Sequence, residues 1–566
     1  MVDNSLANSL VDTLNEQLKI IESEPQNENA LCEIAKISNS IGNHEQALIH
    51  ANKAFSLNPT NTKAIAQMSE SFAYMGRIDK SIICYKQALK INQSDPNILD
   101  GLQKIIKNAV RSGYNARQLL KQFDDTIKNN YQLLAFFGTI LIDTEDYEGA
   151  LEYLQRSDKL NSKFVTNLIN LSIVHNFLGN FAKAEKAARK ALKISPNNAD
   201  AIVSIAVVKK YTSVNDADID IINKSLEDKE NTPTQDSNLY FALGKIYDDC
   251  QEYEKAFSTF EIANKEKYEI IKDSKTVNYI DYITQEEKDF VFDKDFVNKT
   301  EGFGTKLDKA IFIIGCPRSG STLIEQILSS HPQIGSTGEN TQSLFETAKL
   351  ISKKYGGTYP ECLRNMSEED SIFFGDKYIE SITNIALEDS DYLINKTLDN
   401  FCHIGLIKLI TPNAKIINCY RHPLDVCLSI YFHSFDNMVG NFYQLEAIGE
   451  YYKKYTKMLK IWDELYPDFI HNIYYENIVS NKEAVIKGLL DSCNINWNDN
   501  CLSHEKNKRA IKTSSSWQAR NPVYKSSINR WKNYEEFIAD LIEQLADEIK
   551  DYDKRLKKDK KLYNNP

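Results

Sequence analysis

The chain has 566 residues, enough for three or four domains at about 150 residues each. Apolar residues make up 42% and charged residues 26%, which excludes a wholly disordered or collagen-like chain. The 68 basic and 79 acidic residues give a net charge of −11, which argues against a general nucleic-acid-binding protein. Any anionic ligand must therefore be held by a local group of donors.

The N-terminal residues 1–5 contain no basic stretch followed by an apolar one, and no run of about 18 apolar residues occurs in the chain. We therefore expect a cytoplasmic protein with no membrane span. The 10 cysteines are scattered singly, with no Cys-x-x-Cys pair, which predicts reduced thiols and no bound metal. A basic cluster over 550–561 alternates with Asp and is interpreted as a solvated helix end.

The first half of the chain repeats with a period of 34 residues. Small residues recur at this offset in two places: Gly42, Ala47 and Ala54 against Gly76, Ser81 and Ala88, and Ala150 and Ser157 against Ala184 and Ala191. Residues 240–263 give the clearest single unit, Tyr-x2-Leu-Gly-x2-Tyr followed by Ala-x3-Phe-x2-Ala.

This pattern resembles the tetratricopeptide repeat, in which two antiparallel helices cross at small residues. At least five units lie within 28–265, whereas 100–130 and 200–234 fit the period poorly. A plain helical bundle without a binding role is the alternative. Stacked repeats form a concave groove, so we expect residues 1–265 to bind a protein or peptide partner.

A charged and aromatic segment, 266–303, predicts a helical connector. Beyond it, short apolar runs alternate with helical stretches, which is typical of an α/β domain with a central parallel sheet over 304–566. The fold class expected is therefore a two-part chain, an all-α repeat solenoid followed by an α/β domain of the P-loop kind.

The α/β region opens with a strand, a tight loop and a helix. The apolar run Lys309–Gly315 leads into Cys-Pro-Arg-Ser-Gly-Ser-Thr (316–322) and then the helical segment 323–330. The glycines at 315 and 320 and the helix N-terminus can turn several N–H groups toward a phosphate or sulfate. Ser321 occupies the position of the P-loop lysine, which disfavours hydrolysis of ATP or GTP. The alternative is a purely structural turn.

A second strand over 414–420 is followed by Arg421, and Ser429 lies eight residues further on. Because Pro423 suits the first position of a helix, Arg421 should lie just outside a helix N-terminus, where its guanidinium can bind a phosphate. In the alternative, Arg421 pairs with Asp425 and Ser429 is inert.

These two motifs resemble the cofactor-binding motifs of the sulfotransferases. The resemblance implies 3′-phosphoadenosine 5′-phosphosulfate (PAPS) as co-substrate and no metal ion. It places the 5′-phosphosulfate on the first loop and the 3′-phosphate on the arginine and serine of the second. The residues so assigned are Pro317, Arg318, Ser319, Gly320, Ser321, Thr322, Arg421 and Ser429.

The same resemblance, closest to the tyrosylprotein sulfotransferases, implies three catalytic residues. Glu339, in Gly-Ser-Thr-Gly-Glu after the first helix, would be the base. Lys396, at the end of a strand after 391, and Arg318 would stabilise charge on the leaving oxygen. A surface turn for Glu339 and a solvated end of a strand for Lys396 remain the alternatives.

Two further assignments also come from the resemblance. Tyr475, in the segment 472–477, would contact the adenosine, although a packed core tyrosine fits the pattern equally well. Residues 513–531 resemble the loop that closes over the 3′-phosphate; this chain has Asn521 where the family has lysine, and Arg520 would substitute for it.

The sequence therefore predicts a PAPS-dependent sulfotransferase that acts on a hydroxyl, with a protein or peptide acceptor, tyrosine included, preferred. A saccharide or a small alcohol is the second choice. Two other hypotheses are a nucleotide phosphotransferase and a repeat scaffold with an inactive sulfotransferase domain.

Overall fold

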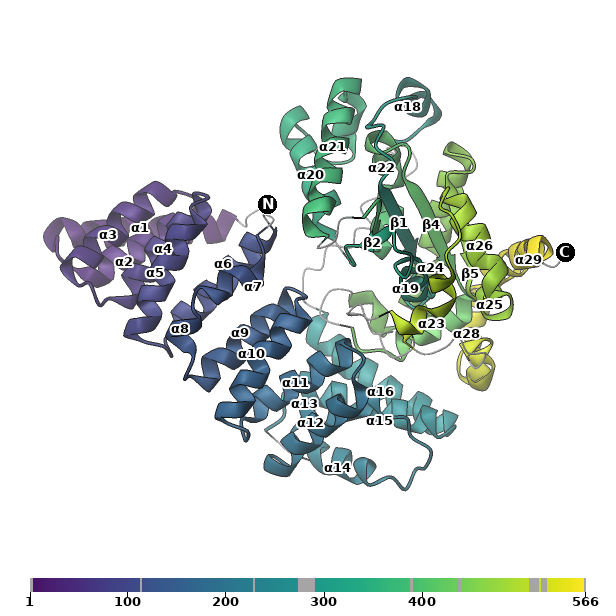
Figure 1. Cartoon of the computed structure of the whole chain (residues 1–566), viewed down its shortest axis with the longest axis horizontal. Helices are drawn as coiled ribbons and strands as arrows, with labels where there is room; N and C mark the ends of the chain where they lie inside the picture. Colours follow the sequence, from purple (N-terminus) through teal and green to yellow (C-terminus); the bar gives the residue numbers. More distant parts are fainter. Residues whose placement is uncertain are drawn as a thin grey trace. The chain divides into compact units, whose positions relative to one another are not determined.

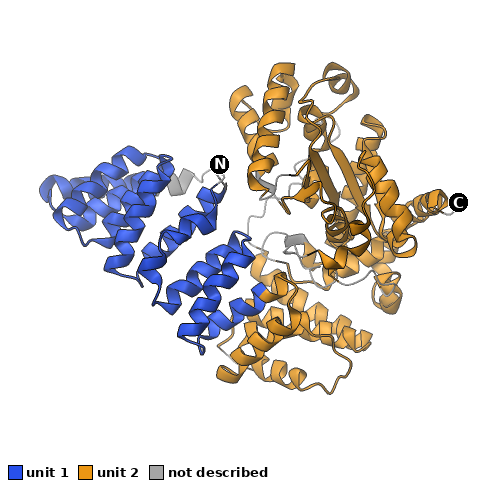
Figure 2. Ribbon diagram, viewed as in Figure 1, with its two compact units in different colours: residues 1–174 blue, residues 175–566 orange. Residues whose placement is uncertain are grey.

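The computed structural model describes residues 4–111, 114–227, 230–272, 291–339, 341–386, 390–435, 440–507, 519–520 and 527–563. The chain forms two compact units, residues 1–174 and residues 175–566 (Figure 2). The boundary between them falls inside the helical repeats. The domain limits expected from the sequence, 1–265, 266–303 and 304–566, stay a prediction.

The first unit consists of helices (Figure 1). In chain order they are α1 (Asn4–Ser23), α2 (Glu28–Ser40), α3 (His44–Leu57), α4 (Thr62–Tyr74), α5 (Ile78–Ile91), α6 (Pro96–Arg111), α7 (Ala116–Lys121), α8 (Asp124–Ile127), α9 (Tyr131–Asp143), α10 (Tyr147–Leu160) and α11 (Val165–Phe177), the last of which crosses the boundary. The pairs α2/α3, α4/α5 and α9/α10 are predicted repeats. Short helices α7 and α8 fall in the stretch that fitted the period poorly.

The predicted small residues lie where the paired helices meet. Ala47, Ala54, Ala88 and Ala150 are fully buried. The turn between the helices of a pair requires a left-handed residue, and Gly42 takes this conformation at φ 85° and Gly76 at φ 75°. The period of 34 residues therefore records the spacing of both the close contact and the turn.

The second unit begins with the remaining repeats. Its helices are α12 (Phe181–Ile194), α13 (Ala199–Val208), α14 (Ala217–Leu226), α15 (Pro233–Asp249) and α16 (Tyr253–Ile271). The pairs α11/α12 and α15/α16 complete the five predicted units. In the last pair Gln251 supplies the left-handed turn at φ 64° in place of glycine. The added Cβ of a residue at Gly244 would come within 2.8 Å of the Phe260 ring, which explains why this crossing needs glycine.

The α/β part of the second unit is built on a parallel sheet of five strands in the order β2-β3-β1-β4-β5. The strands are β1 (Ala310–Gly315), β2 (Ile334–Ser336), β3 (Tyr392–Asn395), β4 (Lys415–Tyr420) and β5 (Ile470–Tyr474). All six residues of β1 are buried, as expected for a central strand with both faces covered. The predicted strands before 316, after 391 and over 414–420 are confirmed.

Helices and 3₁₀ segments connect the strands. They are α18 (Lys294–Lys299), α19 (Ser321–Leu328), α20 (Thr341–Tyr355), η2 (Glu361–Asn365), α21 (Glu368–Ile385), η3 (Leu398–His403), α22 (Ile404–Ile410), α23 (Pro423–Tyr431), η4 (Gly440–Tyr443), α24 (Leu445–Leu465), α25 (Tyr475–Ser480), α26 (Lys482–Ser492), η5 (Asp499–Lys506), η7 (Arg530–Phe537), α28 (Ala539–Gln544) and α29 (Ala546–Tyr563). Of the predicted connector 266–303, residues 273–290 lie outside the described part. Within the described ranges, no helix is long and apolar enough to cross a bilayer.

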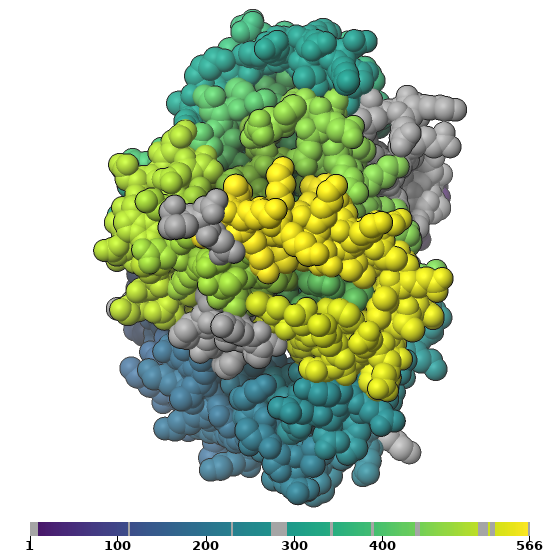
Figure 3. All heavy atoms as spheres, turned by 90° about the vertical axis from the view of Figure 1, so that its right-hand side faces the viewer, coloured from purple at the N-terminus to yellow at the C-terminus, as the bar shows by residue number. Residues whose placement is uncertain are grey.

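The last repeat and the α/β part share one hydrophobic core. Phe257 and Phe260 of α16 belong to the same buried cluster as Phe312 of β1 and Trp462 of α24. The Phe260 ring stacks on that of Phe432, just after α23, with centroids 4.3 Å apart. The C-terminal segment, yellow in Figure 3, lies across the surface of this part, and α29 buries Tyr552. Repeat α15/α16 is therefore structurally part of the α/β unit.

Candidate functional site

The predicted site residues follow the carboxyl ends of all five parallel strands. The loop 316–320 follows β1, Glu339 follows β2, Lys396 follows β3, Arg421 follows β4 and Tyr475 follows β5. In an open parallel sheet this edge is where ligands bind. Motifs that are far apart along the chain therefore lie together at one edge of the sheet.

The loop after β1 is a tight turn with two left-handed residues. Gly320 takes a left-handed φ of 102°, and Arg318 also has a positive φ, 69°. A Cβ at Gly320 would come within 2.9 Å of the Tyr475 ring, and one at Gly315 would approach Ser319 Oγ and the Cys419 carbonyl oxygen, both at 2.8 Å. Ser319 Oγ is buried and has no hydrogen-bond partner among the described residues, so the loop retains a donor for a ligand.

The β1 loop is bonded to Arg421, just before α23, and to Ser429, within α23, across more than 100 residues of sequence. Arg318 Nε donates to Ser429 Oγ at 3.0 Å, and Arg421 Nη1 donates to the Arg318 carbonyl oxygen at 3.1 Å. Arg421 is buried, its guanidinium lies 5.2 Å from the Tyr475 ring centroid, and its Nε has no hydrogen-bond partner in the described part of the chain. One donor of this arginine thus stays available for a phosphate oxygen.

The alternative in which Arg421 simply pairs with Asp425 is not what the structure shows. Asp425 accepts hydrogen bonds from the backbone N–H groups of Asn529 and Trp531, each at 2.9 Å. Pro423 occupies the first turn of α23, as predicted. Arg421 Nη2 donates to the Ser527 carbonyl oxygen at 2.7 Å. The segment 527–531 therefore covers the start of α23, next to Arg421.

Lys396 lies at the centre of a cluster of charges. Its side chain is 1% exposed, and Nζ lies 2.6 Å from Glu339 Oε1 and 3.6 Å from Glu325 Oε2. Burial alone would lower the pKa of Lys396, but the carboxylates of Glu325 and Glu339 outweigh burial and the pKa is raised. The lysine is therefore a fixed positive charge rather than a solvated strand end.

Glu339 is half exposed, at 49% of its side chain, while its loop is tied to β3. Lys396 N–H donates to the Gly338 carbonyl oxygen at 2.9 Å, and Thr337 N–H donates to the Ile394 carbonyl oxygen at 2.7 Å. Glu339 is thus a carboxylate held beside Lys396 with one side open to solvent.

Arg520 is placed differently from the other arginines. Its Nη2 donates to the Phe177 carbonyl oxygen at 2.9 Å and its Nη1 to the Asn507 carbonyl oxygen at 3.2 Å. Burial lowers its pKa. Asn521 and most of the predicted closing loop lie outside the described residues, so the assignment of Arg520 to the 3′-phosphate stays a prediction.

Sequence reasoning missed two residues of this edge. Glu325 on α19 is buried, accepts a 2.7 Å hydrogen bond from Ser336 Oγ and is the second carboxylate beside Lys396. His433 follows α23, and burial together with the nearby positive charge of Arg318 lowers its pKa to about 3. The sequence could have indicated a buried Glu325, because this residue lies among apolar residues of a short helix. No local pattern indicates a role for His433.

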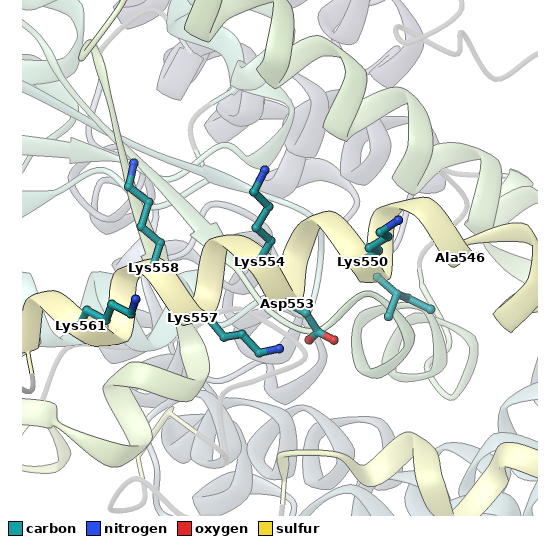
Figure 4. A pocket seen from close by; sticks show the side chains of 8 residues that line it. Ala546, Lys550, Asp553, Lys554, Lys557, Lys558 and Lys561 are labelled. Atoms are coloured by element: carbon teal, nitrogen blue, oxygen red, sulfur yellow. The ribbon is translucent and has the colours of Figure 1, made fainter.

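A separate hollow of about 630 Å³ lies along α29 (Figure 4). It is lined by Ala546, Ile549, Lys550, Asp553, Lys554, Lys557, Lys558 and Lys561. This basic cluster belongs to a regular helix, and none of its residues is among the predicted site residues. In the described part of the chain, no three His, Cys, Asp or Glu side chains are placed to hold a metal ion.

The fold and this edge define a class: a helical repeat array joined to a parallel-sheet domain with a glycine-containing turn after its first strand. Residues 310–499 match the sulfotransferase family, and residues 28–61, 62–95 and 165–198 match the tetratricopeptide repeat. The chain therefore carries a sulfotransferase-family domain together with tetratricopeptide repeats, and both resemblances read from the sequence are confirmed.

Individual relatives cover both parts. An uncharacterized protein of Aquifex aeolicus (strain VF5) is 25% identical over 541 residues, spanning 87% of this chain and 70% of that protein. The solved sulfotransferase domain from the curacin biosynthetic pathway is 22% identical with a TM-score of 0.29, covering 40% of this chain and 90% of that one. YrrB, described as a repeat protein with an unusual peptide-binding site, is 17% identical with a TM-score of 0.20, covering 43% and 96%.

Proposed function

We propose that this protein transfers the sulfuryl group of PAPS to a hydroxyl acceptor. The observation that carries the proposal is the bonding of Arg318 in the β1 loop to Arg421, just before α23, and to Ser429, within α23. Two anion-binding elements at adjacent strand ends suit a ligand with two separate phosphate groups.

The donors of these two elements fit such a ligand. The loop N–H groups, Ser319, Ser321 and Thr322 would hold the phosphosulfate, and Arg421 with Ser429 would hold the 3′-phosphate. Tyr475 closes the side of the loop at Gly320, consistent with a contact to the adenosine.

Bound PAPS would supply the sulfuryl group: the acceptor oxygen bonds to sulfur, and the bond from sulfur to the 5′-phosphate oxygen breaks. Glu339 would take the proton of the acceptor hydroxyl. Lys396, Glu325 and Glu339 together carry a net charge of −1, so uptake of a proton by Glu339 leaves these three side chains with no net charge. Lys396 and Arg318 would stabilise the charge on the leaving oxygen.

The repeats support a protein or peptide as acceptor. Tetratricopeptide arrays present concave surfaces that bind polypeptide segments, so a hydroxyl on a bound protein, tyrosine included, is the acceptor we propose. Peptide pools with tyrosine, serine or threonine, together with saccharides, offered to the protein with PAPS would identify the product by mass spectrometry. Sulfation of saccharides alone would contradict the peptide acceptor.

Calorimetric titration with 3′-phosphoadenosine 5′-phosphate tests the cofactor, with ATP as the competing nucleotide. We expect binding of the bisphosphate and loss of that binding in Arg421→Ala. Arg364→Ala is the matched control, because Arg364 is an exposed arginine paired with Asp293 at 3.5 Å and should leave binding unchanged. No binding by the wild-type protein would overturn the proposal.

A further inference from the structure

The last repeat reaches the candidate nucleotide site through a chain of hydrogen bonds that begins at Asp248, near the end of α15. Asp248 Oδ1 accepts a hydrogen bond from Tyr534 Oη at 2.6 Å, and Oδ2 pairs with Arg530 Nη2 at 2.5 Å. Both partners belong to η7, nearly 290 residues further along the chain. One carboxylate of the repeat array therefore holds this 3₁₀ segment at two points.

The residues just before and within η7 contact Arg421 and two of its neighbours at the start of α23, His422 and Asp425. The N–H groups of Asn529 and Trp531 donate to the carboxylate of Asp425. The Trp531 ring stacks on His422 with centroids 5.4 Å apart, and the Ser527 carbonyl oxygen accepts from Arg421 Nη2. The position of Arg421 thus depends on where η7 lies.

The contacts between Asp248 and η7 are largely shielded from solvent. The Asp248 side chain is 14% exposed and that of Arg530 30% exposed, and Tyr534 is fully buried. The Arg530 guanidinium also lies 5.5 Å from the Phe432 ring centroid, and the Tyr534 ring packs against Phe432 at 4.8 Å. Loss of the carboxylate would leave a buried hydroxyl and a largely covered guanidinium without this acceptor, which favours displacement of η7.

We propose that Asp248 is a positioning residue of the nucleotide site, acting through Arg530 and Tyr534 on η7 and through Asp425 on Arg421. The last repeat then helps to position the nucleotide site, in addition to forming the end of the repeat array. This inference rests on the proposed function for the identity of the ligand. The hydrogen-bond network from Asp248 to Arg421 does not depend on which ligand binds.

Asp249 supplies a matched control. It is the next residue of α15, 7% exposed, and it pairs with Lys210 at 2.5 Å and Lys245 at 2.7 Å, both within the repeats. Asp249→Ala removes a buried carboxylate from the same helix without touching η7. A general destabilisation of α15 would affect both variants, whereas positioning of the site would affect only the Asp248 variants.

The experiment titrates the full-length wild type, Asp248→Ala, Asp248→Asn and Asp249→Ala with 3′-phosphoadenosine 5′-phosphate. We expect binding about tenfold weaker in Asp248→Ala. Asp248→Asn should be intermediate, because it keeps an acceptor for Tyr534 but loses the charge opposite Arg530. Asp249→Ala should match the wild type. Equal affinities for Asp248→Ala and the wild type, or equal losses in Asp248→Ala and Asp249→Ala, would overturn the inference.

Amide hydrogen exchange separates this inference from the proposed function, because it needs no ligand. The N–H groups of Asn529 and Trp531 should exchange at least about tenfold faster in Asp248→Ala than in Asp249→Ala, since their bonds to Asp425 would open more often. If the wild type binds no bisphosphate, the proposed function fails and exchange alone decides. Unchanged exchange in Asp248→Ala would then refute the anchoring role.

Discussion

Substitution Lys396→Met removes the positive charge between Glu325 and Glu339 and keeps an unbranched apolar side chain in its place. Glu325 is then buried, 6% exposed, without its cation 3.6 Å away. The attraction between the two charges is about 5 kcal/mol at an effective dielectric constant of about 20. Breaking buried ion pairs by removing one partner destabilises proteins by about 3–5 kcal/mol.

The loss has an upper limit, because the stranded carboxylate can take up a proton. Protonating a carboxylate with an unfolded-state pKa of about 4.3 costs about 3.7 kcal/mol at pH 7 and about 1.6 kcal/mol at pH 5.5. We therefore expect Lys396→Met to lower the free energy of unfolding by about 3–4 kcal/mol at pH 7. The difference from the wild type should shrink as the pH falls toward 5.5.

Urea unfolding followed by tryptophan fluorescence measures this change in the relevant unit, because all four tryptophans lie at or after residue 462. The double variant Lys396→Met/Glu325→Gln should regain all but about 1 kcal/mol of the loss. Glu339→Gln alone should cost less than about 1 kcal/mol, since Glu339 is 49% exposed. A loss below about 1 kcal/mol at pH 7, a loss that grows on acidification, or no recovery with Glu325→Gln would refute the reasoning.

Three further predictions concern the loop and its surroundings. Gly320→Ala should destabilise the second unit by about 1–3 kcal/mol more than Gly356→Ala in urea unfolding, because both glycines have a positive φ but only a Cβ at 320 meets the Tyr475 ring; equal losses would contradict this. Arg318→Gly should be about 1 kcal/mol more stable than Arg318→Ala, since glycine relieves the left-handed backbone at φ 69°, whereas both should bind 3′-phosphoadenosine 5′-phosphate more weakly than the wild type; an alanine variant as stable as the glycine variant would count against strain at this position. Burial and Arg318 lower the pKa of His433 to about 3, so the unfolded chain binds a proton that the folded chain does not as pH falls from about 6.5 to 3, and stability falls with it; His433→Gln should show a shallower loss over this range, and an unchanged slope would refute the assignment.

Local sequence patterns predicted the parts of the site that depend on residues close together in the sequence. The apolar run before Gly315 and the small polar residues after it specify a strand, a turn and a helix start, and Pro423 marks the first turn of α23. The period of 34 residues predicted the paired helices even where Gln251 replaces the usual glycine at the turn. Each of these features depends on residues that are near one another in the sequence or on a pattern that repeats along it.

Contacts between distant segments did not follow from such patterns. Glu325 reads as an ordinary helical glutamate until the chain folds Lys396 against it. Asp248 reads as a surface residue of a repeat, yet its partners lie at 530 and 534. Nor does the sequence reveal that Asp425 binds the backbone of 529–531 rather than Arg421. Each depends on tertiary packing, on which helical and strand periodicity carry no information.

The contact between α29 and α25 has a consequence for synthesis of the protein. Tyr552 donates a hydrogen bond to buried Glu476, whose other oxygen accepts from His422 N–H, next to Arg421. Burial raises the pKa of Glu476 even with these bonds in place. A nascent chain therefore cannot complete the surroundings of Arg421 until residue 552 has left the ribosome. We expect the repeats before α15, which are made first, to be able to fold well before the proposed nucleotide site is complete.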